Sequence, residues 1–144
     1  EVLNGTYRRV AALPEAVLQV FITCDVETAK IINLIAILLD SRLFFDFLHE
    51  VYSEKIRLGE KEITDRDLNV FFSDKALQSD VVAGWTDTAV RKLKQCFTRM
   101  MFEAGLLERS AKPRTIKPIH IDYRTEELLT ANGLGEYMKA VKGV

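Results

Sequence analysis

The sequence is poor in the residues that build the common metal and catalytic sites. Its 144 residues include only two cysteines, two histidines and three prolines. Cys24 and Cys96 lie in apolar surroundings without CxxC spacing, which favours buried thiols in a reducing compartment over a disulfide or a metal site. Neither His49 nor His120 belongs to a cluster with metal-ligand spacing. We therefore expect a cytoplasmic protein without a bound metal or cofactor.

Motifs of the common enzyme families are also missing. The sequence has no glycine-rich phosphate loop, no G-x-G-x-x-G fingerprint and no G-x-S-x-G turn. The segment HEVYS, which begins at His49, has the first half of a zinc-protease motif, but the residue four positions on is Ser53 instead of histidine. These absences remove most enzyme classes.

One acidic stripe has the spacing of a possible metal site. Asp46, Glu50 and Glu54 repeat at four residues, so their carboxylates share a helix face and could in principle hold Mg²⁺. Hard-cation sites need oxygens that converge from more than one element. We therefore interpret the stripe as a solvated helix surface, offset by Arg42 and Arg57.

Long hydrophobic runs are missing as well. The longest apolar stretch, residues 31–39 (IINLIAILL), is far shorter than the roughly 20 residues of a membrane-spanning helix. It predicts a core helix, and we expect no membrane association. Because 48% of the residues are apolar, the chain can fill one compact core. The sequence begins at Glu1 without methionine, so we expect its N-terminal part to be truncated at the start.

Apolar spacing and capping residues predict a mainly α-helical fold. Asp25 and Ser41 can each cap a helix, and Gly59 can supply the left-handed residue at a helix end. Thr64, followed by Asp67 three residues later, resembles a capping box at the start of another helix.

Two parts of one compact unit are predicted. Residues 1–62 form an N-terminal helical part, and residues 63–144 form a part similar to a helix-turn-helix with a wing. Near the end of the second part we expect two short extended pieces around a polar turn, because Leu107 and later Ile119 and Ile121 alternate with polar residues. The fold therefore has at most one short β-hairpin.

The net charge of −1 conceals an uneven distribution. Residues 1–84 hold nine Lys/Arg and 14 Asp/Glu, a balance of −5, whereas residues 85–124 hold nine and four, a balance of +5. A concentration of basic residues can steer a polyanion toward one face of a protein. Charged blocks also occur on proteins that bind no nucleic acid, so a merely solvated surface stays open.

Residues 87–104 predict an amphipathic helix capped by Thr86. On a helical wheel, six apolar residues share one side: Val90, Leu93, Phe97, Met100, Met101 and Ala104. The opposite side carries Thr88, Arg91, Lys92, Gln95 and Arg99, with Lys94 on one flank. Phe102 also falls on the polar side, so we expect either the following loop or a partner to cover it.

A basic turn with Lys112, Arg114 and Lys117 follows this helix. A capped helix, a connection, a basic helix and a basic turn resemble a helix-turn-helix with a wing, in which the second helix meets the major groove and the wing meets phosphates or the minor groove. The connection, residues 73–85, is longer than the three or four residues of a tight turn, so we expect a short extra helix in it.

Nine candidate nucleic-acid-binding residues follow from this pattern: Thr88, Arg91, Lys92, Lys94, Gln95, Arg99, Lys112, Arg114 and Lys117. Arg and Lys can donate to guanine edges or phosphates, Gln can pair with adenine, and Thr can contact phosphate.

Residues 34–109 resemble the BrxA family of BREX bacteriophage-defence systems. The resemblance rests on SRLFFDFLHEVY, on the short helix ending in FFSDK, on the Trp and Thr-rich cap before the basic helix, and on EAGLLE. The tail ending in YMKAVKG is similar to the C-terminus of that family as well.

The resemblance implies a small, mainly helical, cytoplasmic protein without enzymatic activity of its own. It would act beside a methyltransferase, ATPases and a phosphatase-like component in excluding phage DNA. Members have been compared with the RNA-binding antitermination protein NusB and are regarded as DNA-binding. By position, the basic helix of the family maps onto Thr88, Arg91, Lys92, Gln95 and Arg99. We therefore expect double-stranded DNA and other BREX components as partners, with RNA as an alternative ligand.

Two other functions stay open. The chain could be a scaffold that docks other defence proteins through Phe102 and its acidic helix face, with the cations merely solvated. It could also be a winged-helix transcriptional regulator, which predicts a dimer and a specific operator.

Overall fold

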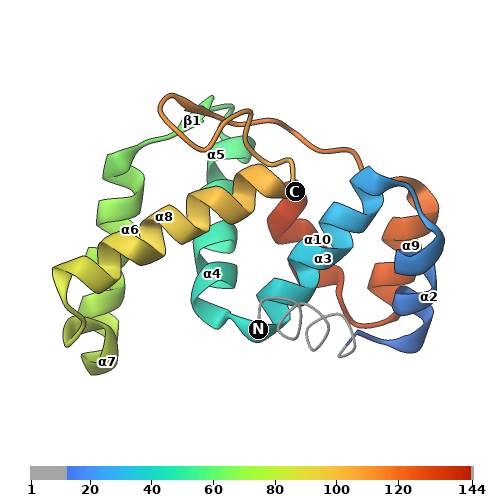
Figure 1. The fold of residues 1–144 in the computed structure, drawn as a ribbon, viewed down its shortest axis with the longest axis horizontal. Helices are drawn as coiled ribbons and strands as arrows, with labels where there is room; N and C mark the ends of the chain where they lie inside the picture. Colours follow the sequence, from blue (N-terminus) through green and yellow to red (C-terminus); the bar gives the residue numbers. More distant parts are fainter. Residues whose placement is uncertain (1–12, 144) are drawn as a thin grey trace.

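Helices dominate the computed structural model, which describes residues 13–143 (Figure 1). In chain order the elements are α2 (Glu15–Thr23), α3 (Val26–Asp40), α4 (Arg42–Phe47), the π-helix η1 (Leu48–Tyr52), α5 (Ser53–Arg57), β1 (Glu62–Ile63), α6 (Asp65–Gln78), α7 (Asp80–Ala83), α8 (Asp87–Glu103), β2 (Arg114–Thr115), α9 (Tyr123–Ala131) and α10 (Gly135–Lys142). The predicted mainly α-helical fold is confirmed. Within the described residues, no helix has the length and apolar character that crossing a membrane requires.

The predicted helix ends are formed by the predicted side chains. Asp25 and Ser41 each accept a hydrogen bond at 3.3 Å from the backbone N–H three residues on. The capping box is complete: the backbone N–H of Thr64 donates to Asp67 at 2.7 Å, and that of Asp67 donates to Thr64 Oγ1 at 3.1 Å. Gly59 has a φ of 76° and ends the helix before it. The extra helix expected in the long connection is α7.

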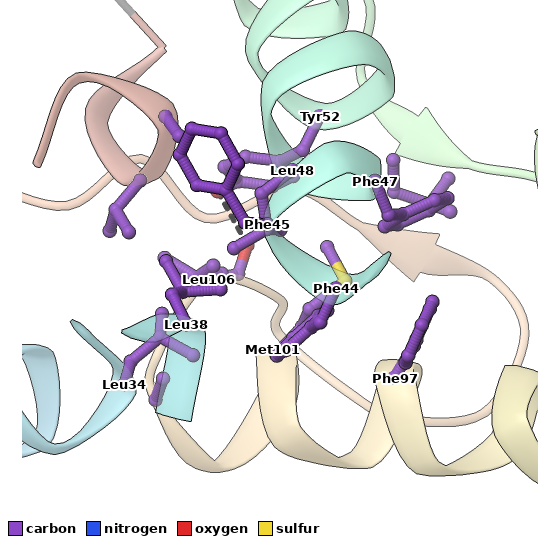
Figure 2. Close-up of a cluster of buried hydrophobic side chains, with 14 of the residues drawn as sticks. Leu34, Leu38, Phe44, Phe45, Phe47, Leu48, Tyr52, Phe97, Met101 and Leu106 are labelled. Atoms are coloured by element: carbon purple, nitrogen blue, oxygen red, sulfur yellow. Dashed lines mark hydrogen bonds between the residues drawn. The ribbon is translucent and has the colours of Figure 1, made fainter. Parts of the chain in front are cut away.

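The buried side chains form two clusters, which we call the aromatic and the aliphatic cluster. The aromatic cluster (Figure 2) lies mainly between α4, η1, α6 and α8, and its buried aromatic members are Phe44, Phe45, Phe47, Tyr52, Phe71, Phe72 and Phe97. The buried members of the aliphatic cluster, from α2, α3, α9, α10 and nearby loops, are Leu13, Val17, Ile31, Ile32, Ile35, Ala36, Ile121, Leu129, Leu134 and Met138.

Two helices join these clusters. On α3, Leu34 and Leu38 belong to the aromatic cluster and Ile32 to the aliphatic one; on α10, Val141 and Met138 divide in the same way. The aliphatic cluster thus packs the last two helices against the first ones (Figure 1). The proposed division at residue 62 stays a prediction, and the packing crosses it.

A small antiparallel sheet lies beside the helices. β1 pairs with β2, and Leu107 forms a further antiparallel bridge with Ile116. The second extended piece was expected around Ile119 and Ile121, as an edge strand if it is a strand at all, and it is not one, because the pairing residues come earlier in the chain. Pro118 has no N–H to donate, so the ladder cannot continue beyond it.

Candidate nucleic-acid interface

The basic helix α8 is anchored by its apolar side, as predicted. Thr86 Oγ1 accepts a hydrogen bond from the backbone N–H of Ala89 at 3.1 Å and so caps the helix. Phe97 and Met101 are buried and point toward α4 and η1 (Figure 2). The ring of Phe97 stacks on that of Phe44 with centroids 4.8 Å apart. Packing on this side leaves the opposite side of α8 at the surface.

That opposite side carries the predicted polar residues, and all five are exposed: Thr88, Arg91, Lys92, Gln95 and Arg99. Arg91, Lys92 and Arg99 form no ion pair with any residue between 13 and 143. Within the described part of the chain, these three cations therefore have no carboxylate within ion-pair distance.

Lys94, on the flank of α8, is held by α6. Its Nζ donates to Asn69 Oδ1 at 2.5 Å and lies 5.9 Å from the centroid of the Phe72 ring. Both contacts direct this ammonium group toward α6, and a cation over a ring face is attracted by the ring quadrupole. Lys94 therefore lies at the contact between α6 and α8.

The cations of the basic turn have an acidic partner that the sequence did not reveal. Arg114 Nη1 lies 2.9 Å from Asp65 Oδ1, and Lys112 Nζ forms an ion pair with Asp65 Oδ2. Hydrogen bonds from Lys112 and then from Arg114 hold the pKa of Asp65 below its usual value. At the start of α6, Asp65 has only the local signature of a first-turn anion. Nothing in the pattern connects it with an arginine 49 residues away.

Arg114 is the most enclosed of these cations, with a side chain only 13% exposed. Its Nε is buried and has no hydrogen-bond partner among the described residues. Lys112, by contrast, has a side chain that is 68% exposed. The same carboxylate thus contacts one nearly buried guanidinium and one ammonium group that faces solvent.

Two surface hollows bring most of the predicted residues together. The first, which we call the wing hollow, has a volume of about 360 Å³ and is lined by Asp65, Leu68, Asn69, Arg91, Lys94, Gln95, Thr98, Ser110, Lys112 and Arg114. The second, the outer hollow, has a volume of about 440 Å³ and is lined by Lys92, Gln95, Cys96, Thr98, Arg99 and Ser110. The shared residues Gln95, Thr98 and Ser110 make the two hollows one continuous face.

Three predicted residues lie apart from these hollows. Thr88 and Lys117 are exposed but line neither of them. Phe102 is 44% exposed, so the loop after α8 leaves much of its ring uncovered. Ser110 and Asn69, which the sequence did not single out, line the hollows instead, because the fold places the turn and α6 beside α8.

The acidic stripe is paired rather than simply solvated. Asp46 contacts Arg42 at 3.0 Å and Lys75 of α6 at 3.2 Å, and the same Lys75 contacts Glu50 at 2.9 Å. Arg57 forms the expected ion pair with Glu54. Within residues 13–143, no group of three or more His, Cys, Asp and Glu is placed to hold a metal ion. The stripe serves to tie α6 to α4 and η1.

Comparison with known proteins agrees with the family resemblance. The sequence model of the BrxA family matches residues 1–133. The chain is 36% identical over 143 residues to the BREX protein BrxA of Bacillus cereus (strain H3081.97), an alignment that covers 99% of this chain and 72% of that protein. A crystal structure of an uncharacterized protein from Magnetospirillum magneticum has the same fold, with a TM-score of 0.81 at 18% identity over 94% of this chain and 71% of that chain. The chain therefore belongs to the BrxA family of BREX bacteriophage-defence systems.

Proposed function

We propose that this chain is a non-enzymatic, cytoplasmic accessory protein of a BREX system that binds duplex DNA with low sequence specificity. One observation carries the proposal. Arg91, Lys92 and Arg99 are exposed on one side of α8, unpaired within the described residues, and next to the turn that holds Lys112 and Arg114. A face of this kind suits a polyanion, because each cation that meets a phosphate releases condensed counterions.

The chemistry of the face explains the low specificity. Its cations can contact phosphates at any sequence, whereas base recognition depends on bidentate donors and acceptors that reach the groove edges. Gln95 lies in the middle of the face and is the side chain best suited to an adenine edge. If about four cations meet phosphates, the log–log salt slope is about −3 to −4.

A charge-matched pair of variants tests the proposal. The first variant combines Arg91→Ala, Lys92→Ala and Arg99→Ala. The control removes three exposed cations from α3, α9 and α10 on the far half of the molecule, through Lys30→Ala, Arg124→Ala and Lys139→Ala. Fluorescence anisotropy with a labelled duplex across a salt series measures affinity and slope. We expect the first variant to bind more weakly and with a shallower slope than the control.

Equal affinities of the two triple variants would refute a specific role for this face. A melting curve accompanies each variant, since surface substitutions of this kind should change the free energy of unfolding by less than about 0.5 kcal/mol. The same titration with single-stranded RNA distinguishes the duplex from the alternative ligand. Tighter binding to RNA at every salt concentration would redirect the proposal to RNA.

Phe102 favours a second function, the docking of another BREX component. Phe102 is 44% exposed on a helix face that is otherwise polar and charged. Aromatic residues are enriched in protein–protein interfaces, so an exposed aromatic residue suits a docking site. We expect Phe102→Ala to weaken capture of a BREX partner in a pull-down while leaving duplex affinity unchanged. Loss of duplex affinity instead would assign the ring to DNA binding.

The small sheet supports the third function, a winged-helix regulator. Residues near Leu107 and Ile116 pair around the basic turn, and β1, which precedes α6, pairs with β2 on the other side. This order is the one expected of a helix-turn-helix with a wing. A regulator should form dimers and discriminate strongly between unrelated duplexes in a competition assay. Equal competition by random duplexes would favour low-specificity binding.

A further inference from the structure

We propose that the wing hollow is a binding site for one backbone phosphate of a nucleic acid, in which the phosphate replaces the Asp65 carboxylate as the partner of Lys112. The inference rests on the proposed DNA-binding function and extends it. It assigns a ligand group to a particular hollow and an inhibitory role to a carboxylate. It also explains how a turn whose cations are already paired can still contribute to binding.

The charge of the wing hollow favours an anion of the size of a phosphate group. Four cationic side chains line it, Arg91, Lys94, Lys112 and Arg114, against the single carboxylate of Asp65. Neutral donors also line it, among them Gln95 and Ser110. With one carboxylate for four cations, the site keeps an excess of positive charge after the internal pairs have formed.

Arg114 points to unused donor capacity in the hollow. It binds Asp65 through Nη1 at 2.9 Å, while its buried Nε has no partner in residues 13–143. A buried donor without an acceptor is costly, and a guanidinium group can bind a carboxylate or a phosphate with two parallel hydrogen bonds. Arg114 lines the hollow and has donors besides the Nη1 that binds Asp65, and these suit a phosphate oxygen.

Lys112 is the cation that can change partner. Its side chain is 68% exposed, and Asp65 itself is 47% exposed, so their ion pair lies at the mouth of the hollow. Exposed ion pairs contribute little to stability, so they rearrange at small cost. Arg114, which is only 13% exposed, stays on Asp65 and keeps the turn in place.

The exchange has a signature in the salt dependence. A cation that meets a phosphate normally adds about 0.9 to the magnitude of the log–log slope, through release of a counterion from the DNA. When Lys112 leaves Asp65, the carboxylate keeps Arg114 but loses one of its two cations, so it attracts solution cations more strongly and offsets part of that release. Lys112 should therefore contribute to affinity but less to the slope, whereas Arg91, which pairs with no carboxylate in residues 13–143, should contribute fully to both.

The first experiment compares Asp65→Asn with Asp74→Asn by duplex anisotropy over a salt series. Both variants remove one carboxylate from α6, and the two positions lie on opposite faces of that helix. We expect Asp65→Asn to raise affinity about two- to fivefold more than Asp74→Asn, and to steepen the slope more than it does, by up to about 0.9. Equal effects of the two variants would overturn the proposal, as would weaker binding by a folded Asp65→Asn variant.

A second experiment holds even if Asp65→Asn disturbs the fold. Lys112→Ala and Arg91→Ala are compared in the otherwise unchanged chain, since both side chains lie at the surface. We expect both to weaken duplex binding, Arg91→Ala with a loss of about 0.9 in slope and Lys112→Ala with a smaller loss. If Lys112→Ala lost as much slope as Arg91→Ala, or left the affinity unchanged, the exchange would be contradicted.

Inorganic phosphate distinguishes a backbone phosphate from a free one. Sodium phosphate and sodium chloride of equal ionic strength should displace the duplex equally, because the hollow contacts a phosphate held in place by its neighbours. Displacement by phosphate at much lower ionic strength would show a free-anion site and overturn the backbone assignment. Failure of the proposed function would give a different result. The triple variant of α8 would then bind duplex DNA as tightly as its charge-matched control, independently of the affinity measured for Asp65→Asn.

Discussion

The two buried clusters of this protein differ in chemistry, and only one of them supports the candidate interface. In the aromatic cluster, neighbouring rings such as those of Phe44, Phe47, Phe71, Phe72 and Phe97 lie with centroids 4.8 to 5.7 Å apart. The buried members of the aliphatic cluster, within the described residues, carry no ring. Aromatic pairs prefer particular orientations, whereas aliphatic side chains can adapt to one another with less loss.

The difference shows how a cationic helix can be held in a fixed orientation. Phe97 of α8 contacts three rings, those of Phe44, Phe47 and Phe72. Such contacts restrain rotation of α8 about its axis, and that rotation decides which side chains face solvent. The aliphatic cluster packs α2 and α9 against α3 and α10, and none of its buried residues lines either hollow.

The largest expected effect tests this contrast directly. Phe97→Ala should lower the free energy of unfolding by about 4 kcal/mol, because it removes a buried ring and three ring contacts. Leu129→Ala in the aliphatic cluster should cost about 3 kcal/mol. Urea denaturation followed by circular dichroism measures both. A larger loss at Leu129 would contradict the expectation that Phe97 contributes more than Leu129 to the free energy of unfolding.

Gly143 tests the contact at the end of α10, the helix that joins the two clusters. Its φ is 81°, and an added Cβ would lie 2.6 Å from the Cβ of Ile56. Gly133 has a similar φ of 78° but open space around it. Gly143→Ala should therefore cost about 2 to 3 kcal/mol and Gly133→Ala about 1 kcal/mol in thermal or urea unfolding. Equal costs would mean that Ile56 moves aside and accommodates the methyl group.

Tyr52 provides a polar tie within the aromatic cluster. Its buried hydroxyl donates to the backbone oxygen of Leu106 at 3.0 Å, and the same oxygen also accepts from the N–H of Lys117 at 2.9 Å. Because the oxygen keeps one donor, Tyr52→Phe should cost only about 1 kcal/mol. A loss above about 3 kcal/mol would show that the hydroxyl group does more than this single bond.

The same residue gives a prediction at high pH. Burial raises the pKa of the Tyr52 phenol above its ordinary value. The unfolded chain loses this proton above about pH 10 while the folded chain keeps it, so the stability from Tyr52 is present below that pH and falls as pH rises. Tyr52→Phe should therefore flatten the decline of the unfolding free energy above pH 10. An unchanged decline would assign it to other groups.

Asp67, which completes the capping box of α6, gives the smallest expected effect. Burial raises the pKa of this carboxyl, but hydrogen bonds from Lys55 and Thr64 outweigh burial and leave the pKa lowered. Its contribution is therefore present above the unfolded pKa of about 3.9 and lost as pH falls through the folded value. Asp67→Asn should cost about 0.5 to 1 kcal/mol near pH 7 in urea titrations, and this cost should shrink as pH falls below about 3.9. A cost that persists at low pH would contradict this origin.

Local signals in the sequence predicted the helix ends and the two sides of α8. Ser41 and Thr64 form the expected caps because a cap depends on residues only three positions apart. The buried and exposed sides of α8 follow from its helical period, which placed Phe97 inside and Arg91 outside. Phe102 was correctly flagged on the polar side, where it is 44% exposed.

Long-range pairs were beyond these signals. Apolar and polar residues alternate around 119–121, as in a strand, yet the sheet pairs residues 114–116 instead. The pairing depends on β1, which lies far earlier in the chain. Lys112 and Arg114 were predicted as nucleic-acid-binding cations of a basic turn without any internal partner being named, and the fold brings Asp65 to both. Alternation and charge describe a segment, but they do not specify its neighbour.

The sequence by itself determined the helical class, the capped and amphipathic α8 and a concentration of basic residues after residue 84, because each depends on neighbours within a few residues. Only the tertiary structure decided which cations are unpaired. Among residues 13–143 it leaves Arg91 and Arg99 without an ion-pair partner, turns Lys94 toward α6 and places Asp65 beside Lys112 and Arg114. The reason is physical: the availability of a charge depends on the nearest opposite charge, and folding brings that charge from a distant part of the chain.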